Sequence, residues 1–399
     1  MPVGGAHCGD MPRQAWYTAA MPFDLTDEQR AIVGEARERA RDTLAPLVAE
    51  GETGRISRPL LGALASLGLL GRLFPASAGG SRPDDSISAL ELCLLREGLA
   101  QGSTEAETAL AMQGLGGYPI LQSGRAKTVQ RWVPSIARGE AVAAFALTEP
   151  QHGSDAAAID LRAEPDADGY RLTGVKAWIS NAPDADVYTL FARTTPDAGA
   201  RGVTAFAVPG DATGLTGTPV ELLSPHPIGT LELDGVFVEA GDVLGEVDHG
   251  FRVAMRTLDL FRPSVGAFAV GMAQAALDAA LQYAASRTAF GKPLKDLQAV
   301  SHLLADMATR TEASRLLVYA AANAFDSGRP GVTKSSAMAK LFATEAAQFV
   351  VDSAVQIHGA SALQRGHLLE HLYRDVRAPR IYEGTSEIQR EVIARELYR

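Results

Sequence analysis

Residues 168–179 read Asp-Gly-Tyr-Arg-Leu-Thr-Gly-Val-Lys-Ala-Trp-Ile, and this stretch decides the class of fold. Asp168-Gly169 is typical of a tight hairpin turn, because both residue types accept the positive φ that such turns require. Strand-like runs flank the turn at 158–164 and 170–179, so we expect an antiparallel pair. Further short apolar runs, separated by Pro and Gly clusters, lie at 142–147, 187–193, 203–208 and 231–238. Strands that follow one another without helices predict an antiparallel sheet or barrel rather than a βαβ fold.

Helical periodicity comes before this β segment. Thr26 and Gln29 form a capping-box pattern, in which each side chain bonds the other residue's backbone N–H at the start of a helix. Further helical patterns lie at 60–70 and 86–99. The run Gly-Leu-Gly-Gly at 114–117 is expected to interrupt the chain, with more helix to about Ile136.

Helical periodicity also follows the β segment, from Gly250 to the end of the chain. Alanine-rich segments in this part favour close packing of helices, as in a bundle. The sequence therefore predicts an α+β multidomain fold. Its expected parts are a loose tail (1–22), an N-terminal helical domain (23–140), a central antiparallel β-barrel or sheet domain (141–248) and a C-terminal four-helix bundle (249–399).

Composition excludes several classes of function. The net charge is -10 and the pI is near 5.4, which argues against a nucleic-acid partner because phosphate binding needs a surplus of Lys and Arg. The longest apolar stretch, Val265 to Leu277, contains glycines and is too short to span a bilayer, so we expect a buried helix. Cys8 and Cys93 are the only cysteines, which favours a reducing compartment such as the cytoplasm and no disulfide framework.

Common sequence motifs give little support for a nucleotide-binding site or a metal site of a known type. No G-x-G-x-x-G follows a strand and no P-loop pattern occurs, so Rossmann and P-loop binding lack their fingerprint. His367-Leu-Leu-Glu-His371 matches a zinc pattern with two imidazoles on one helical face. Nearby arginines oppose a dication and no third ligand is evident, so a solvated or subunit-contacting face is the other interpretation. We expect no metal.

The stretch Arg380-Ile-Tyr-Glu383-Gly-Thr-Ser-Glu-Ile-Gln389 contains a candidate base. Apolar surroundings raise the pKa of a carboxyl group and bring a weak base toward working pH. Gly384 lets the backbone turn tightly or approach a ligand closely. By residue types alone, an ordinary turn before a helix is the favoured explanation of the stretch.

Two other stretches are candidates for a ligand cradle. Residues 145–155 leave a strand and turn through Gly153, where hydroxyls and backbone N–H groups could face a planar ring. Trp178 and Ser180 offer an aromatic plane beside a hydroxyl. For residues 145–155 the alternative is a plain Pro-Gly loop between strands, and for 287–294 it is a loop between helices.

These motifs occur together in one order. TEPQHGSD (148–155), KAWISN (176–181), RTAFGKPL (287–294), the Gln356 segment and IYEGTSEIQR (381–390) jointly resemble the acyl-CoA dehydrogenase family, from about Phe23 to the last residue. The resemblance implies that family's fold, with FAD held between the β domain and the bundle. It also implies a homotetramer, a dimer of dimers, because the FAD site is shared between chains. Expected partners are an acyl-CoA substrate of fatty acid metabolism and an electron-transferring flavoprotein.

The resemblance also implies roles for individual residues. The flavin ring and ribityl chain would be lined by Phe145, Leu147, Thr148, Gly153, Ser154, Trp178 and Ser180. The adenosine end would be contacted from a neighbouring subunit by Arg287, Phe290, Gln356 and Gly359. Thr385 and Glu387 would complete the cofactor cradle. Substrate binding would involve Ser154, Asp259, Arg262, Tyr382 and Gly384.

Glu383 matches the family's catalytic base. It would remove the α-proton of an acyl thioester while the β-carbon passes hydride to flavin N5. In some relatives the base lies instead just before the matching arginine, where this chain has Phe261, which cannot accept a proton. One departure from the family is Gly359-Ala360-Ser361-Ala362, which adds two methyl groups at a glycine-rich site. We expect these methyl groups to loosen or shift FAD binding.

Two alternatives keep this fold. The substrate could be carried by a carrier protein, or could be an alicyclic or aromatic-ring thioester. The chain could also be a non-catalytic, flavin-binding member used in assembly, although an intact Glu383 and flavin-contact set count against this. Acyl length and branching depend on pocket depth, which is set by how the helices of the first and third domains meet.

Overall fold

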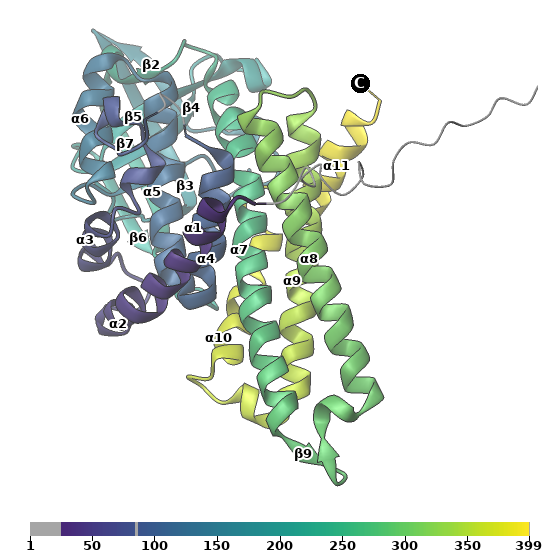
Figure 1. Cartoon of the computed structure of the whole chain (residues 1–399). Coiled ribbons are helices and arrows are strands. Elements are labelled where there is room, and N and C mark those ends of the chain that lie inside the picture. The colour runs from purple at the N-terminus through teal and green to yellow at the C-terminus, as the bar shows by residue number, and fades with distance from the viewer. Residues whose placement is uncertain (1–24, 84–86, 399) are drawn as a thin grey trace, which may run out of the picture.

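The computed structural model describes residues 25–83 and 87–398. The expected tail at 1–22, Cys8, Phe23 and the expected helix start at Ser86 lie outside these residues. The described elements follow the predicted order of helices, sheet and helices (Figure 1). The sheet and the first helices form one lobe, from which the C-terminal helices extend.

The N-terminal part is helical, as expected. Gln29 N donates to Thr26 Oγ1 over 3.2 Å and Thr26 N donates to Gln29 Oε1 over 2.9 Å, so the predicted capping box is confirmed. The helix expected at 60–70 ends earlier, because Gly68 takes a φ of 74°. The helices are α1 (Asp27–Arg39), α2 (Ala45–Glu50), α3 (Arg58–Ser66), α4 (Ala89–Gly102), α5 (Thr104–Ser123) and α6 (Ala126–Ala137).

The expected interruption at 114–117 is wrong, because α5 runs through it without a break. These glycines serve packing instead. A Cβ on Gly116 would lie 2.6 Å from the backbone N of Ala144, and a Cβ on Gly117 would lie 3.0 Å from the ring of Phe74. Only glycine allows α5 to approach the first strand this closely.

The central sheet contains the strands that were expected and adds short ones. Its order is β6-β7-β3-β2-β4-β5-β8, with β1 paired to β4. Most pairs are antiparallel, but β1 and β2 each pair with β4 in parallel, which corrects the purely antiparallel expectation. The strands are β1 (Ala143–Ala146), β2 (Arg162–Asp166), β3 (Gly169–Ser180), β4 (Val187–Arg193), β5 (Val203–Pro209), β6 (Leu215–Pro219), β7 (Ile228–Glu239) and β8 (Val243–Leu244).

The predicted hairpin joins β2 to β3, with Asp166 opposite Gly169. The positive φ of 47° falls on Ala167, however, and not on Asp168-Gly169. Gly169 is needed for another reason: a Cβ there would lie 2.2 Å from the carbonyl oxygen of Val238 on β7. The strand expected from residue 158 begins only at Arg162, because residues 156–158 form a helical turn.

The C-terminal part is built on long helices that pack side by side (Figure 1). The expected buried helix around 265–277 is part of α7, which also packs against α4. Helix α7 is long and apolar enough to cross a membrane, but 78% of its most apolar window is buried, as in a core helix. The elements are α7 (Gly250–Ser286), β9 (Thr288–Ala289), β10 (Lys292–Pro293), α8 (Gln298–Asp326), α9 (Val332–His358), α10 (Leu368–Asp375) and α11 (Ser386–Glu396).

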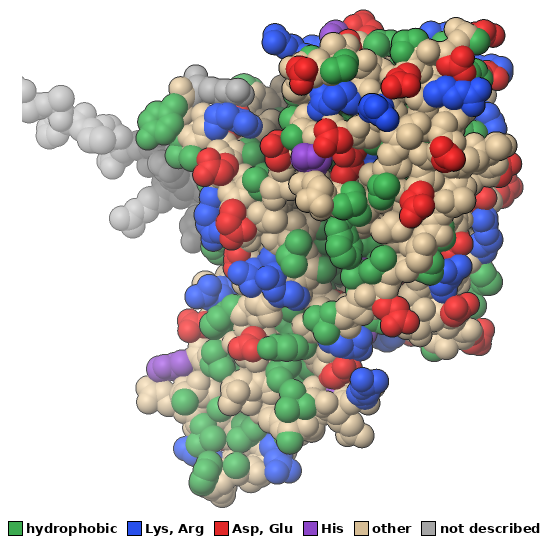
Figure 2. All heavy atoms as spheres, turned by 180° about the vertical axis from the view of Figure 1, so that it is seen from behind, with side chains coloured by type: hydrophobic (Ala, Val, Ile, Leu, Met, Phe, Trp, Pro, Cys, Tyr) green, Lys and Arg blue, Asp and Glu red, His purple; other side chains and the backbone are tan. Residues whose placement is uncertain are grey.

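The surface of this helical part carries apolar groups. Figure 2 shows hydrophobic side chains gathered over the protruding end of the bundle and across the middle of the same face. Phe290 at the tip of the β9–β10 hairpin is 91% exposed and Leu363 is 69% exposed. Side chains this large and this exposed mark a surface that another protein or ligand can cover.

Gly116→Ala should destabilise the protein, because the added methyl group meets backbone atoms of Ala143 and Ala144 that cannot move aside. We expect the free energy of unfolding to fall by about 1–3 kcal/mol in urea titration. Gly62→Ala is the matched control, since a Cβ at this position in α3 meets nothing within 4 Å. Equal stability of the two variants would contradict the packing assigned to α5.

Candidate active site

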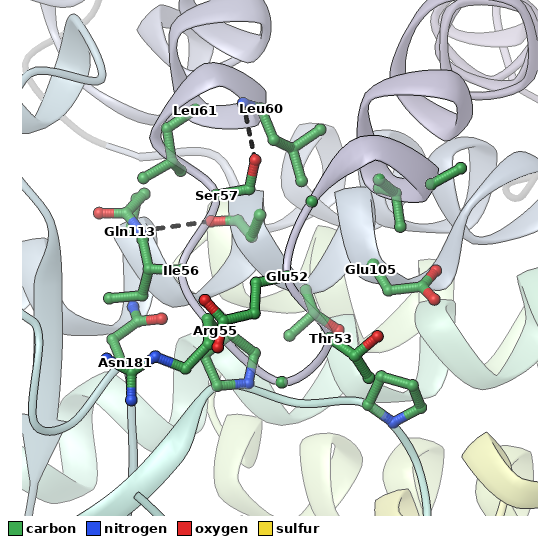
Figure 3. A pocket seen from close by; sticks show the side chains of 18 residues that line it. Glu52, Thr53, Arg55, Ile56, Ser57, Leu60, Leu61, Glu105, Gln113 and Asn181 are labelled. Carbon is green, nitrogen blue, oxygen red and sulfur yellow. Dashed lines mark hydrogen bonds between the residues drawn. The ribbon is translucent and has the colours of Figure 1, made fainter.

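One cavity of about 270 Å³ lies where the loop after α2, the helix α5 and the loop before β7 meet (Figure 3). Its polar lining includes Glu52, Arg55, Glu105, Gln113 and Asn181. Glu383 is not part of this lining. The candidate base therefore sits elsewhere, and this cavity belongs to the boundary between the first helices and the sheet.

Glu383 lies in the segment between α10 and α11, with its side chain turned into the protein. Carboxylate oxygen Oε2 is buried and has no hydrogen-bond partner among the described residues. Burial raises the pKa of this carboxyl group, and the positive charges of Arg96, Lys340 and Arg262 partly offset that rise. A carboxylate with an unused lone pair in a dry setting is suited to accept a proton.

The backbone at Glu383 is held in an uncommon conformation. Glu383 has a φ of 53° and Gly384 a φ of 91°. Gln389 Nε2 donates to the carbonyl oxygens of Glu383 and Gly384 over 3.1 and 3.0 Å, and Lys340 Nζ donates to that of Gly384 over 2.7 Å. Gly384 is required here, because a Cβ would lie 2.6 Å from Gln389 Nε2. The interpretation of an ordinary turn does not explain so many fixed donors.

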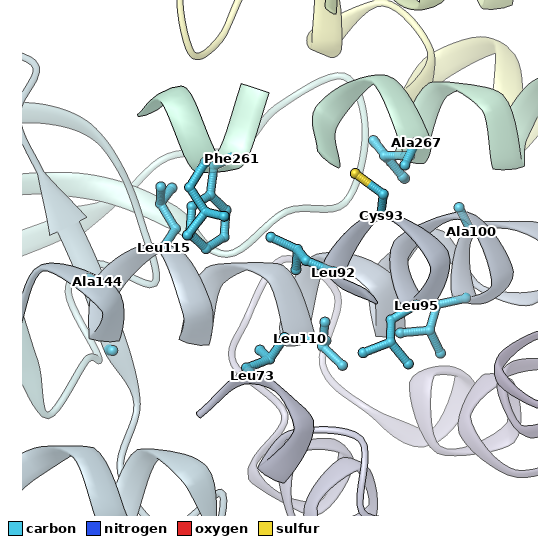
Figure 4. Packing of buried hydrophobic residues seen from close by; sticks show 14 of the residues in the cluster. Leu73, Leu92, Cys93, Leu95, Ala100, Leu110, Leu115, Ala144, Phe261 and Ala267 are labelled. Carbon is cyan, nitrogen blue, oxygen red and sulfur yellow. The ribbon is translucent and has the colours of Figure 1, made fainter. Parts of the chain in front are cut away.

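An apolar core joins the N-terminal helices to α7. Figure 4 shows Leu92 and Cys93 of α4, Leu110 and Leu115 of α5, and Phe261 of α7 packed together. Phe261 is 0% exposed, and a Cβ on Gly114 would lie 2.9 Å from its ring. The position of the alternative base therefore holds a core side chain.

Arg262 lies next to Glu383, and Asp259 lies beside Arg262. Arg262 Nε lies 3.4 Å from the carbonyl oxygen of Glu383, and Arg262 Nη1 lies 3.4 Å from Asp259 Oδ1. Burial raises the pKa of Asp259 and lowers that of Arg262. Tyr382 is half-buried beside Glu383, whereas Ser154 is exposed on the loop after β1. Substrate contacts of these residues stay predictions.

The residues expected around the flavin ring gather where β1 ends beside β3. Ala177 N donates to the carbonyl oxygen of Thr148 over 3.0 Å, which joins the two segments. Trp178 sits at an irregularity of the β3–β7 pairing, has a φ of 60° and is 56% exposed. A Cβ on Gly153 would meet nothing within 4 Å, so the loop is open there. Phe145, Leu147 and Ser180 complete this group.

The residues expected at the adenosine end form a second group at the far end of the bundle. Arg287 precedes β9 and Phe290 lies at the tip of the β9–β10 hairpin, while Gln356 and Gly359 lie at the end of α9. The ring of Tyr283, one turn before Arg287, stacks on His358 at 4.2 Å, which brings the two segments together. Figure 1 shows this hairpin well away from the sheet. One chain thus keeps the two groups apart.

Thr385 and Glu387 lie at the start of α11. Thr385 Oγ1 accepts from Ile388 N over 3.3 Å and caps the helix, while Glu387 is exposed. The added methyl groups at the glycine-rich site point in different directions: Ala362 is 0% exposed and Ala360 is exposed. Their effect on FAD affinity stays a prediction.

The two histidines of the zinc pattern have separate partners. His367 Nδ1 accepts from Leu369 N over 3.1 Å and caps α10. His371 Nε2 lies 3.0 Å from Asp375 Oδ2 and 2.7 Å from Thr104 Oγ1 of α5. Across residues 25–83 and 87–398, no group of three or more His, Cys, Asp or Glu side chains is placed to hold a metal ion.

Asp375 links all three parts of the chain. Its carboxylate accepts hydrogen bonds from Thr104 of the N-terminal part and from Ser224 of the loop before β7. In the same loop, His226 Nε2 lies 2.7 Å from Ser180 Oγ, and burial lowers the pKa of His226 to about 4. His371, by contrast, has a raised pKa, because Asp375 stabilises its charged form.

The sequence reasoning missed Arg96, Glu107 and Lys340. Arg96 is 1% exposed, pairs with Glu107 and donates from Nη1 to Ser264 Oγ over 2.7 Å. Each of the three residues is a charged side chain inside an apolar helical run, as in Leu-Cys-Leu-Leu-Arg96. A charge in such a run must be paired when the helix is buried. A charged residue within an apolar helical run is therefore a sequence signal that could have identified all three residues.

Comparison with known proteins identifies the family of this chain. The family models described as the N-terminal, middle and C-terminal domains of acyl-CoA dehydrogenase match residues 26–140, 144–236 and 248–398. The chain is 36% identical over 379 residues to cyclohexane-1-carbonyl-CoA dehydrogenase of Geobacter metallireducens, covering 94% of this chain and 98% of that protein.

Two solved structures show the same fold. Butyryl-CoA dehydrogenase from Megasphaera elsdenii superposes with a TM-score of 0.89 at 35% identity, covering 95% of this chain and 100% of the other. PigA with FAD and proline superposes with a TM-score of 0.88 at 30% identity, covering 95% and 99%.

The raised pKa of His371 predicts a pH-dependent stability. A histidine whose folded pKa lies above its unfolded value stabilises the protein fully below the unfolded pKa, and this contribution is lost as pH rises through the folded pKa. His371→Gln should therefore lower the unfolding temperature at pH 6 and do so less at pH 9. His302→Gln, at an exposed position on α8, is the control. A gap between His371→Gln and the unaltered protein that is the same at both pH values would refute this assignment.

Proposed function

The chain belongs to the acyl-CoA dehydrogenase family of FAD-dependent oxidoreductases, and we propose that it converts an acyl-CoA thioester to the 2-enoyl thioester with Glu383 as the base. The single observation that carries this proposal is the buried oxygen Oε2 of Glu383, which has no partner among the described residues. Unpartnered buried polar atoms are rare in folded proteins and are expected where a ligand completes them.

In the proposed reaction Glu383 removes one proton from the carbon next to the thioester carbonyl. The carboxylate becomes a neutral carboxylic acid, and the negative charge moves toward the thioester oxygen. The backbone N–H of Glu383 has no acceptor in the described part of the chain, so it is a candidate donor to that oxygen. Such a donor stabilises the developing charge most where water is excluded.

The residues around Trp178 fit a flavin. The exposed indole offers a flat apolar face, and the hydroxyls of Thr148, Ser154 and Ser180 offer hydrogen bonds near it. Gly153 leaves room for close approach. Bound FAD supplies the acceptor for the β-hydrogen, which leaves as hydride. These residues would hold and orient the ring, as would Phe145 and Leu147.

We further propose that the active form is a homotetramer, a dimer of dimers. The two groups of residues expected to hold FAD are far apart in one chain, and Phe290 and Leu363 expose large apolar surface beside the second group. A second copy that covers this surface would bring Arg287 and Phe290 to the cofactor. Electrons would then pass to an electron-transferring flavoprotein, in the cytoplasm.

A second candidate keeps this chemistry on a ring-containing acyl group. The similarity to cyclohexane-1-carbonyl-CoA dehydrogenase favours it, because that protein's named substrate is alicyclic. A panel of straight-chain, branched, alicyclic and aromatic acyl-CoA thioesters, each added without oxygen, would identify the substrate by bleaching of the yellow flavin. Matched carrier-protein thioesters would reveal a preference for that carrier.

Glu383→Gln should bind FAD and acyl-CoA but bleach the flavin at least about 100-fold more slowly, because an amide cannot accept the α-proton. Glu391→Gln, an exposed position on α11, is the control and should bleach at the normal rate. Stopped-flow absorbance under anaerobic conditions gives the rate. Full speed in Glu383→Gln would refute the role of Glu383.

A further inference from the structure

Lys340 of α9 is a buried cation next to the candidate base. Its side chain is 0% exposed, and Nζ donates to the carbonyl oxygen of Gly384 over 2.7 Å. Burying an ammonium group costs several kcal/mol unless a negative charge or strong acceptors compensate it. A neutral carbonyl is one acceptor, so the full compensation has to come from a carboxylate.

The charges around Glu383 identify that carboxylate. Arg96 is paired with Glu107, and Arg262 with Asp259. Lys340, by contrast, makes no salt bridge with any carboxylate in the described part of the chain. Burial lowers the pKa of Lys340, and the negative charge of Glu383 opposes this decrease.

Glu345 and Glu387 do not take this place. Glu345 on the same helix binds Arg380 at 2.8 Å and accepts from Ser386 Oγ at 2.6 Å. Glu387 is exposed at the start of α11, where solvent screens its charge. Once the pairs Arg96–Glu107 and Arg262–Asp259 are set aside, Lys340 and Glu383 are the two buried charges left to balance each other.

We propose that Lys340 is the counter-ion and a positioning residue of Glu383. Its charge keeps the resting base ionised, and its hydrogen bond to Gly384 holds the peptide that aims the carboxylate into the site. This inference deepens the proposed function and rests on it for its catalytic meaning.

The pairing has a consequence for the reaction. In the resting protein the negative charge of Glu383 and the positive charge of Lys340, which binds the neighbouring carbonyl oxygen of Gly384, offset each other. When Glu383 takes the α-proton, its charge is lost and Lys340 is left as an uncompensated buried cation. Burial lowers the pKa of Lys340 to about 8, so an uncompensated Lys340 cation is costly, and this cost disfavours the protonated state of Glu383.

Infrared titration of Glu383 tests the proposal without relying on turnover. The FAD-loaded protein is titrated with pH, and the carbonyl band of the protonated Glu383 is identified by its absence in Glu383→Gln. Lys340→Met and Lys340→Gln should each raise the midpoint of the Glu383 titration by about one pH unit or more. The reason is that the ionised Glu383 loses the nearby positive charge that stabilises it. Lys334→Met, which removes the same charge six residues earlier on α9, should not move it.

The two variants also separate charge from hydrogen bonding. Gln can still donate to Gly384 and Met cannot, so flavin bleaching above both midpoints should be slower in Lys340→Met than in Lys340→Gln. If the Met variant does not fold, the Gln variant carries the test. In the unaltered protein, the carboxylate band of Glu383 should also shift as Lys340 loses its proton near pH 8.

An unmoved midpoint in a folded Lys340 variant, or no shift of the Glu383 band near pH 8, overturns the inference. The proposed function fails separately, if Glu383→Gln still bleaches the flavin. If the midpoint shifts but Glu383→Gln still bleaches the flavin, Lys340 is the counter-ion of Glu383, but Glu383 is not the catalytic base.

Discussion

The site depends on one constraint: the carboxyl group of Glu383 has a buried oxygen, Oε2, that has no partner among the described residues. Burial raises the pKa of Glu383, and three cations from three helices oppose this rise. Two of these cations, Arg96 and Arg262, form ion pairs with the carboxylates of Glu107 and Asp259. The pKa of Glu383 therefore depends on how closely α4, α7 and α9, which carry these cations, approach the segment before α11.

Small residues make that approach possible. A Cβ on Gly266 of α7 would lie 2.6 Å from Val318 of α8, and one on Gly271 would lie 2.5 Å from the carbonyl oxygen of Glu97 on α4. Helices that pack this closely exclude water and leave little freedom to shift. The charged side chains that enter these helices are fixed with them, which is what a site for proton transfer requires.

The order of the domains and most strands could be predicted from the sequence, because periodicity and turn residues report local structure. Glycines misled the prediction at 114–117, since glycine permits both a break and a close approach, and only the packing of α5 on β1 decides which. For the site, the motif singled out Glu383 as a candidate. Lys340 and Arg96 were not singled out, because their partners are distant in sequence. Which groups a buried charge contacts depends on how the helices pack.

The central claim is that Glu383 itself removes the α-proton, and exchange of that proton with solvent tests it most directly. An acyl-CoA whose β-carbon bears no hydrogen cannot complete the reaction, so α-proton removal is isolated. In D₂O the unaltered enzyme should replace the α-hydrogens with deuterium, as measured by mass spectrometry, and Glu383→Gln should not. Exchange at equal rates in both proteins would contradict the account.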